Sequence, residues 1–123
     1  MTIFSRKQKG FTIVELLVVI VAIGILAAIT IVSYGNWRYR TAQNEVKSDL
    51  NGATSAMESA RNFGTGYPGA IPTSFTASTN VTLTYVSGDL TKYCLMGTST
   101  ADATVIYYVN PPTRSTPTTT VCT

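Results

Sequence analysis

The chain has 123 residues, of which 45% are hydrophobic and only 12% are charged. In soluble domains about a quarter of the residues are charged, so this chain is unusually apolar. It contains two cysteines and no histidine, which excludes a Cys/His zinc site and the histidine-dependent triads of hydrolases. We therefore expect a single small domain with no metal, no other cofactor and no catalytic residues.

The net charge of +3 is concentrated at the N-terminus. Arg6, Lys7 and Lys9 stand in the first ten residues without an acidic companion, and the rest of the chain has as many acidic as basic residues. A balanced remainder argues against a surface that binds nucleic acid. A basic cluster directly before an apolar run is instead typical of a targeting segment.

The segment from Phe11 to Val32 has 22 residues and one charge, Glu15. As a helix it would be about 33 Å long, which matches the roughly 30 Å hydrocarbon core of a bilayer. A buried core helix is the alternative, but too little chain remains to cover a helix that is apolar on all sides. We therefore expect this segment to span a membrane.

An amphipathic pattern follows the apolar segment. Apolar residues recur at steps of three and four, which predicts a helix that runs to about Asn62. No proline occurs between Phe11 and Arg61, so we expect one continuous helix of about 50 residues. Its apolar stripe should pack against the rest of the head, with a partner-binding face as the alternative. The stripe consists of Tyr39, Ala42, Val46, Leu50, Ala53, Met57 and Ala60.

The rest of the chain favours β-structure. Residues 62–80 are rich in Gly, Pro, Ser and Thr and predict a connecting loop. Alternating apolar and polar residues predict an antiparallel meander of three strands at 81–86, 90–96 and 104–109. The tail from Asn110 contains three prolines and should be irregular, ending in a short strand at 119–122. The expected fold class is α+β: a long helix packed on a small antiparallel sheet.

Two residues at the start of the apolar segment are unusual. A secretory signal is cut after its apolar run, but a cut at Gly10 would leave the run as the new N-terminus. A carboxylate within a span costs a few kcal/mol, so Glu15 needs a function or a position near the interface, where it reaches water. Cleavage after Gly10 would create an ammonium at Phe11, four residues before Glu15. Their attraction at contact is about 4 kcal/mol at an effective dielectric of 20.

The sequence Gly-Phe-Thr-Ile-Val-Glu-Leu-Leu at 10–17 resembles the leader junction of type IV pilins and their relatives. The resemblance covers about the first 35 residues and combines a basic leader, Gly10, Phe11, Glu15 and an apolar span. It implies that a prepilin peptidase cleaves after Gly10 and that Phe11 is then N-methylated. It also implies that pilus assembly machinery moves the subunit from the membrane into a helical homopolymer. There Glu15 would meet the Phe11 amine of a neighbouring subunit.

Two features depart from the pattern of this family. Many pilins have a proline near the middle of the long helix, where this chain has Thr30, Ile31 and Val32. A kink would then have to come from Gly24 or Gly35. The head also predicts three clear strands where many pilins have four.

These inferences divide the chain into three parts. Residues 1–10 form a leader that is removed on maturation, 11–35 span the membrane and later form the filament core, and 36–123 form the head. Three basic residues precede the span, and two, Arg38 and Arg40, follow it. This difference predicts a single-pass protein with its N-terminus in the cytoplasm and its head outside.

Cys94 and Cys122 fit a disulfide in an extracytoplasmic head. Such a bridge would close a C-terminal loop and stabilise the head by about 3–4 kcal/mol. Two free thiols in the core are the alternative.

The residues and the resemblance together favour a structural subunit of an extracellular type IV pilus, not an enzyme. Adhesion, surface motility and DNA uptake are its candidate uses, and nucleic acid would enter only as uptake cargo. A pseudopilin of a type II secretion system is the first alternative. Its major members hold calcium with head carboxylates, whereas only Asp89 and Asp102 lie beyond Asn80 here. A signal-anchored membrane protein that never polymerises is the second, and it would need neither Gly10 nor Glu15.

Overall fold

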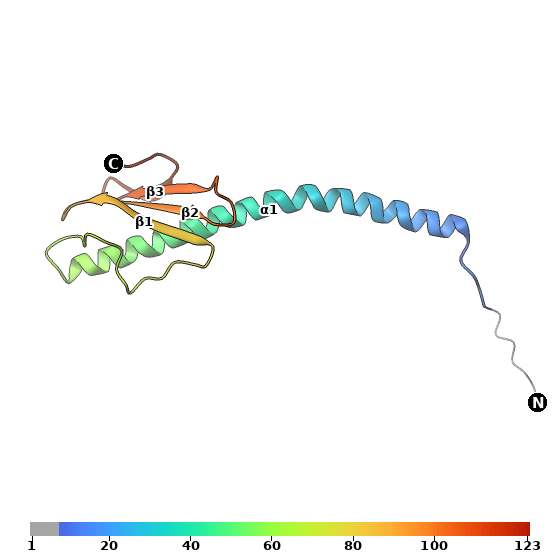
Figure 1. Cartoon of the computed structure of the whole chain (residues 1–123), viewed down its shortest axis with the longest axis horizontal. Helices are drawn as coiled ribbons and strands as arrows, with labels where there is room; N and C mark the ends of the chain where they lie inside the picture. Colours follow the sequence, from blue (N-terminus) through green and yellow to red (C-terminus); the bar gives the residue numbers. More distant parts are fainter. Residues whose placement is uncertain (1–7) are drawn as a thin grey trace, which may run out of the picture. The chain divides into compact units, whose positions relative to one another are not determined.

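The computed structural model describes residues 8–123 (Figure 1). Within this range the helix α1 runs from Ile13 to Asn62 without a break and has 50 residues. The prediction of one continuous helix is therefore confirmed. Most of the expected leader, including Arg6 and Lys7, lies outside the described residues. The described residues up to Asn36 and the segment Trp37–Thr123 form two compact units, and each is considered by itself.

A four-stranded antiparallel sheet forms the second layer of the head. The strands follow one another in chain order across the sheet, which makes it a meander, as expected. The expected number of three strands is wrong, because the tail contributes a fourth. The strands are β1 (Val81–Gly88), β2 (Tyr93–Ser99), β3 (Ile106–Asn110) and β4 (Arg114–Thr118).

Strand β2 begins and ends three residues later than the sequence predicts. Leu90 belongs to the turn before it, where the Asp89 carboxylate accepts hydrogen bonds from the amides of Thr91 at 2.7 Å and Lys92 at 3.0 Å. An aspartate that binds the following amides in this way stabilises a turn against a strand. At the other end Gly97 lies within the ladder, opposite Leu83 of β1 and Tyr107 of β3. The connection between the second and third predicted strands, at 97–103, is correspondingly shorter.

The tail is more regular than expected, although Pro117 lies within β4. Strand β4 stands at the edge of the sheet and pairs only with β3. Proline is tolerated on an edge strand because the amide that it lacks is not needed on the open side. The predicted strand at 119–122 is absent from the structure described here. That segment instead leads to Cys122, which is buried.

The core of the head lies between α1 and the sheet. One stripe of α1 is buried, and Gly97 of β2 lies so close to it that a Cβ atom there would be 2.8 Å from Val46 Cγ1. The predicted stripe is thus confirmed from Ala42 to Met57, whereas Tyr39 is 43% exposed and Ala60 is half-buried. Its buried residues are Ala42, Val46, Leu50, Ala53 and Met57, and those of the rest of the head are Tyr67, Val81, Tyr93, Leu95, Val105, Tyr107 and Val109.

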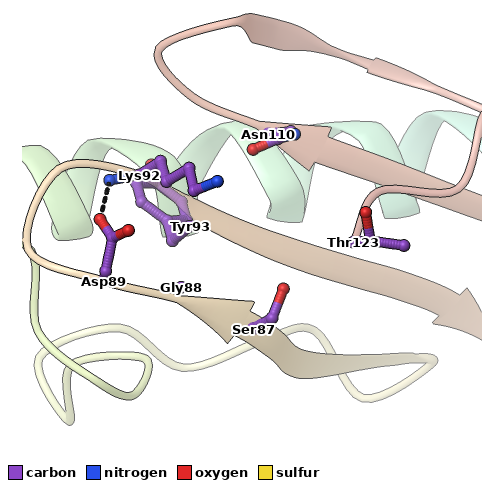
Figure 2. Close-up of a pocket in the computed structure, with 7 residues that line it drawn as sticks. All are labelled: Ser87, Gly88, Asp89, Lys92, Tyr93, Asn110 and Thr123. Carbon is purple, nitrogen blue, oxygen red and sulfur yellow. Dashed lines mark hydrogen bonds between the residues drawn. The ribbon is translucent and has the colours of Figure 1, made fainter.

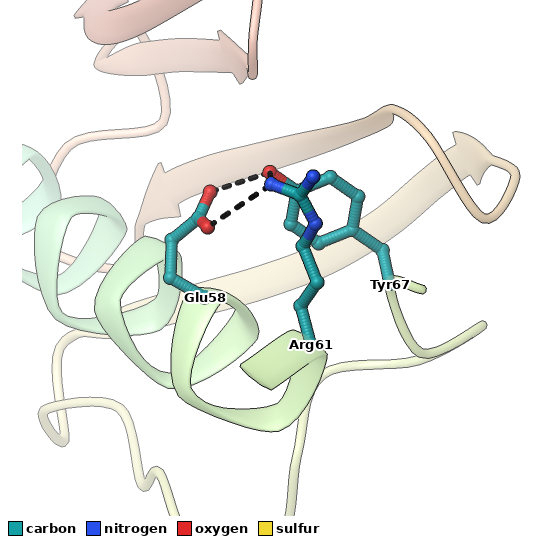
Figure 3. Close-up of polar contacts among 3 residues, drawn as sticks. All are labelled: Glu58, Arg61 and Tyr67. Atoms are coloured by element: carbon teal, nitrogen blue, oxygen red, sulfur yellow. Dashed lines mark hydrogen bonds and ion pairs between the residues drawn. The ribbon is translucent and has the colours of Figure 1, made fainter. Parts of the chain in front are cut away.

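The loop at 63–80 is fastened to the C-terminal end of α1 by a polar cluster (Figure 3). The Tyr67 hydroxyl donates to Glu58 Oε1 at 2.5 Å, and Arg61 Nη1 lies 3.8 Å from Glu58 Oε2. The Arg61 guanidinium also lies over the Tyr67 ring, 4.9 Å from its centroid. The Tyr67 ring in turn packs edge-on against the Tyr93 ring, with 4.7 Å between the ring centroids. The loop is thereby joined to both the helix and the sheet.

Candidate functional site

The start of α1 is fixed by a reciprocal pair of hydrogen bonds between Thr12 and Glu15. The Thr12 amide donates to Glu15 Oε2 at 2.9 Å, and the Glu15 amide donates to Thr12 Oγ1 at 3.3 Å. The Thr12 carbonyl accepts the first helical hydrogen bond, from the Leu16 amide at 3.2 Å. Thr12 is therefore the N-cap of α1 and Glu15 its partner in a capping box.

This cap was not predicted, although the pattern Thr-x-x-Glu at 12–15 is a recognised sequence signature for it. The apolar segment predicts a helix from Phe11 onward. The helix begins at Ile13 instead, because Thr12 uses its hydroxyl to satisfy an amide that has no partner within the helix. Phe11 and Gly10 thus lie in non-helical chain directly before the cap.

The residues at the predicted cleavage position are open to their surroundings. Phe11 is 87% exposed, and Gly10 is exposed as well. A Cβ atom built on Gly10 would meet nothing within 4 Å. Packing among residues 8–123 therefore gives no reason for a glycine at this position.

The expected pairing of Glu15 with a Phe11 amine belongs to the cleaved and assembled subunit and stays a prediction. Residues 10 and 11 are joined by a peptide bond, so Phe11 has no free amine, and the Glu15 carboxylate binds the Thr12 amide instead. That amide belongs to the residue next to Phe11. The carboxylate is therefore held within one residue of the position where cleavage after Gly10 would create an ammonium.

The helix beyond the cap presents an apolar surface on all sides. Every residue from Ile13 to Asn36 is exposed, and the most apolar stretch of α1 has a mean hydropathy of 3.0 with none of it buried. The Thr30 hydroxyl donates a hydrogen bond to the Leu26 carbonyl at 2.8 Å. By length and composition α1 could cross a membrane. An apolar surface of this extent is rarely left uncovered on a monomeric soluble protein.

The two cysteines of the head form the predicted disulfide. Cys94 lies in β2 and Cys122 near the end of the tail, and both are buried. Neither described cysteine is free, so the alternative of two free thiols is wrong. The bridge holds the segment after β4 against the sheet, where it has few apolar side chains of its own to bury.

Two carboxylates of the head, those of Asp89 and Asp102, accept local hydrogen bonds from nearby threonines. Hydrogen bonds from Thr91 hold the pKa of Asp89 below its ordinary value, and hydrogen bonds from Thr104 do the same for Asp102. Both groups fix the turn that they begin. Among residues 8–123 no three His, Cys, Asp or Glu side chains gather as metal ligands would.

A small hollow lies where β1 and β3 end and β2 begins, near the C-terminus (Figure 2). Its volume is about 190 Å³. Pockets for small ligands usually hold roughly 300–1,000 Å³. The lining is mixed, and its lysine and aspartate belong to the turn described above. The lining residues are Ser87, Gly88, Asp89, Lys92, Tyr93, Asn110 and Thr123.

This chain is similar in part to several curated proteins. Residues 5–31 match the prokaryotic N-terminal methylation motif. The chain is 44% identical over 55 residues to a fimbrial protein of Pseudomonas aeruginosa, across 45% of this chain and 36% of that protein. It is 39% identical over 56 residues to the type IV major pilin protein PilA of Myxococcus xanthus, across 46% and 26%. It is 45% identical over 51 residues to the type IV major fimbrial protein FimA of Dichelobacter nodosus, across 42% and 33%.

These matches are regional. They cover less than half of this chain and about a third of the length of the curated relatives. The relatives are named as fimbrial proteins and pilins, which supports a structural role for the region that they share with this chain.

Proposed function

We propose that this chain, which is similar to type IV pilins over less than half of its length, is the precursor of a structural subunit of an extracellular type IV pilus. The observation that carries the proposal is the combination at the start of α1. An exposed Gly10–Phe11 junction is followed at once by a capped helix whose apolar surface is uncovered on every side. The motif match to residues 5–31 supports the same assignment.

Maturation is proposed to occur at this junction. A prepilin peptidase removes residues 1–10 by cutting after Gly10, and Phe11 is then N-methylated. The junction suits a peptidase because it lies in non-helical chain and because Gly10 has open space around it. A peptidase must bind its substrate in extended form, so a helix that began earlier would hide the bond.

The apolar part of α1 is proposed to be covered twice. Before assembly, residues 11–35 span the cytoplasmic membrane with the N-terminus inside. After assembly the same surface packs against other copies in the filament core, and residues 36–123 form the head at the cell surface. The head can stay folded during this transfer because its core consists of residues beyond Trp37.

Glu15 is proposed to guide assembly by pairing with the Phe11 amine of a neighbouring subunit. In the precursor its carboxylate is already turned toward the N-terminus of the helix, where it binds the Thr12 amide. An ammonium that is moved from an interface into an apolar bundle needs a partner, because an unpaired buried charge is heavily penalised. Glu15 provides that partner without a further charged residue.

The head supports the pilus over the secretion pseudopilus. The calcium sites of major pseudopilins draw on head carboxylates, whereas Asp89 and Asp102 each bind the hydroxyl and amide of a nearby threonine. Adhesion, surface motility and uptake of DNA remain the candidate uses of the filament.

Imaging of filaments tests this function. Cells that lack the gene should lose a class of surface filament, and cells that express the chain again should regain it. Antibodies against the head should label the filament along its whole length if the chain is its main subunit. Loss of secretion with no change in surface filaments would favour the pseudopilus. Intact filaments and intact secretion would favour the membrane anchor.

A further inference from the structure

The four consecutive residues Trp37, Arg38, Tyr39 and Arg40, called here the collar, form an unusual group on α1. Trp37 is 61% exposed and Tyr39 is 43% exposed, and both arginines are exposed as well. Ala42, two residues further on, is the first residue of α1 that the head buries. The head core therefore leaves Trp37 mostly exposed and Tyr39 partly exposed.

Helix geometry spreads these side chains around α1. Successive residues of an α-helix are turned by about 100°, so four in a row point in directions that together surround the axis. A protein partner that docks on one side of a helix contacts residues three or four apart. A medium that surrounds the helix instead contacts consecutive residues, as in the collar.

The position of the collar along the helix matches the thickness of a membrane. The 24 residues of α1 from Ile13 to Asn36 rise by about 36 Å. The hydrocarbon core of a bilayer is about 30 Å thick, and the headgroup regions extend this to about 40–45 Å. Trp37 follows directly, so a helix that begins at one interface reaches the opposite headgroup region at the collar.

The chemistry of the collar also fits this place. Tryptophan and tyrosine gather at membrane interfaces, where the ring is apolar and the N–H or O–H meets water. Arginine forms forked hydrogen bonds with phosphate oxygens. Part of the positive charge is balanced from the head, because Arg38 and Asp102 line one hollow. This reduces the conflict between two arginines outside the membrane and the rule that favours basic residues inside.

We propose that the collar binds the phospholipid headgroups of the extracytoplasmic leaflet and sets the depth of the subunit in the membrane before assembly. The proposal rests on the proposed membrane-bound precursor. It adds that residues 37–40 contact lipid, whereas the precursor itself requires only the apolar span.

Trp37 is the only tryptophan in the sequence, so its fluorescence reports on the collar alone. The full chain is placed in vesicles of phosphatidylethanolamine and phosphatidylglycerol whose acyl chains carry bromine either near the headgroup or near the bilayer centre. Bromine quenches tryptophan on contact. We expect a larger loss of Trp37 fluorescence with the shallow bromines than with the deep ones.

Two variants serve as matched controls, each with Trp37→Phe and a new tryptophan on an exposed position of α1. Ile29→Trp places the reporter in the span and should be quenched most by the deep bromines. Ser48→Trp places it beyond the collar and should escape both. Arg38→Gln with Arg40→Gln, in the chain that keeps Trp37, should shift the quenching of Trp37 away from the shallow bromines.

The outcomes separate the collar from the function on which it rests. Quenching of the Ile29→Trp reporter without quenching of Trp37 overturns the collar and leaves the membrane-bound precursor intact. Failure of the Ile29→Trp reporter to respond overturns both. If Trp37 becomes shielded from acrylamide only in filaments and not in vesicles, the partner of the collar is a second copy of the chain and the proposal is wrong.

Discussion

Substitution of Glu15 by alanine separates a filament subunit from a membrane anchor. In an anchor the change removes a costly charge from the span, so insertion should improve or stay the same. In a subunit it removes the partner of the Phe11 amine. We expect Glu15→Ala to be inserted and cleaved normally but to form few filaments. Glu15→Asp should be intermediate, because the charge remains but the reach is shorter by one methylene.

The loss of filaments in Glu15→Ala has two possible causes, a weaker helix cap and a missing ion pair, and their sizes can be compared. Loss of an N-cap hydroxyl costs about 1 kcal/mol. An ion pair at 4 Å contributes about 4 kcal/mol at an effective dielectric of 20. Thr12→Ala removes the hydroxyl that accepts from the Glu15 amide but keeps the carboxylate, whereas Glu15→Ala keeps that hydroxyl and its bond to the backbone amide but removes the carboxylate and with it the ion pair. The difference of about 3 kcal/mol corresponds to on the order of a hundredfold in the assembly equilibrium.

The assay counts filaments per cell and divides by the amount of subunit in the membrane fraction. Thr12→Ser is the matched control, since it keeps the accepting hydroxyl. We expect Thr12→Ser near wild type, Thr12→Ala moderately reduced and Glu15→Ala strongly reduced. Equal losses in Thr12→Ala and Glu15→Ala would show that the carboxylate acts through the helix cap. Wild-type filament numbers with Glu15→Ala would refute the charge pairing altogether.

Three further predictions concern the head, measured by unfolding of the full chain in detergent. Cys122→Ser should destabilise the head by about 3–4 kcal/mol, because the bridge closes a loop with a sequence separation of 28 residues; an unchanged urea midpoint would contradict this. Gly97→Ala should cost about 1–3 kcal/mol, because the new Cβ would lie 2.8 Å from Val46 Cγ1 and 3.0 Å from Leu50 Cγ. Gly69→Ala is its control: a Cβ atom at this position would have no neighbour within 4 Å, so the stability of the head should not change. Burial raises the pKa of the Tyr93 hydroxyl to about 12. Because the pKa is higher in the folded state, Tyr93 makes its full contribution to stability below the unfolded-state pKa of about 10. As the pH rises from about 10 to about 12, the free energy of unfolding falls by about 3 kcal/mol. In Tyr93→Phe this alkaline loss should shrink; a loss as large as in the parent chain would show that other groups cause it.

The helix and its buried stripe could be predicted because their causes are local. A long segment without proline continues as a helix, and apolar residues at steps of three and four face one side. Tyr39 fits the period but precedes Ala42, the first residue of α1 that the head buries, so periodicity alone could not show that it is exposed. The Thr12 cap is also encoded locally, because Thr-x-x-Glu at 12–15 is the sequence pattern of a capping box.

The edges of the strands depend on contacts that no local pattern reveals. Strand β4 was missed because Pro117 argues against a strand unless the strand is known to lie at an edge. Strand β2 begins later than predicted because Asp89 stabilises a turn at residues whose side chains are typical of strands. The contact of Tyr67 with Tyr93 joins a loop to a strand 26 positions away and follows only from the tertiary fold. The disulfide could be predicted because the chain has only two cysteines.

The mass of the subunit in surface filaments tests the central claim most directly. Filaments are sheared from cells, and the N-terminal peptide of the subunit is identified by mass spectrometry. The account predicts a chain that begins at Phe11 with one added methyl group on its amine. A subunit that still begins at Met1, or one that begins near residue 25 after removal of the apolar segment, would contradict it.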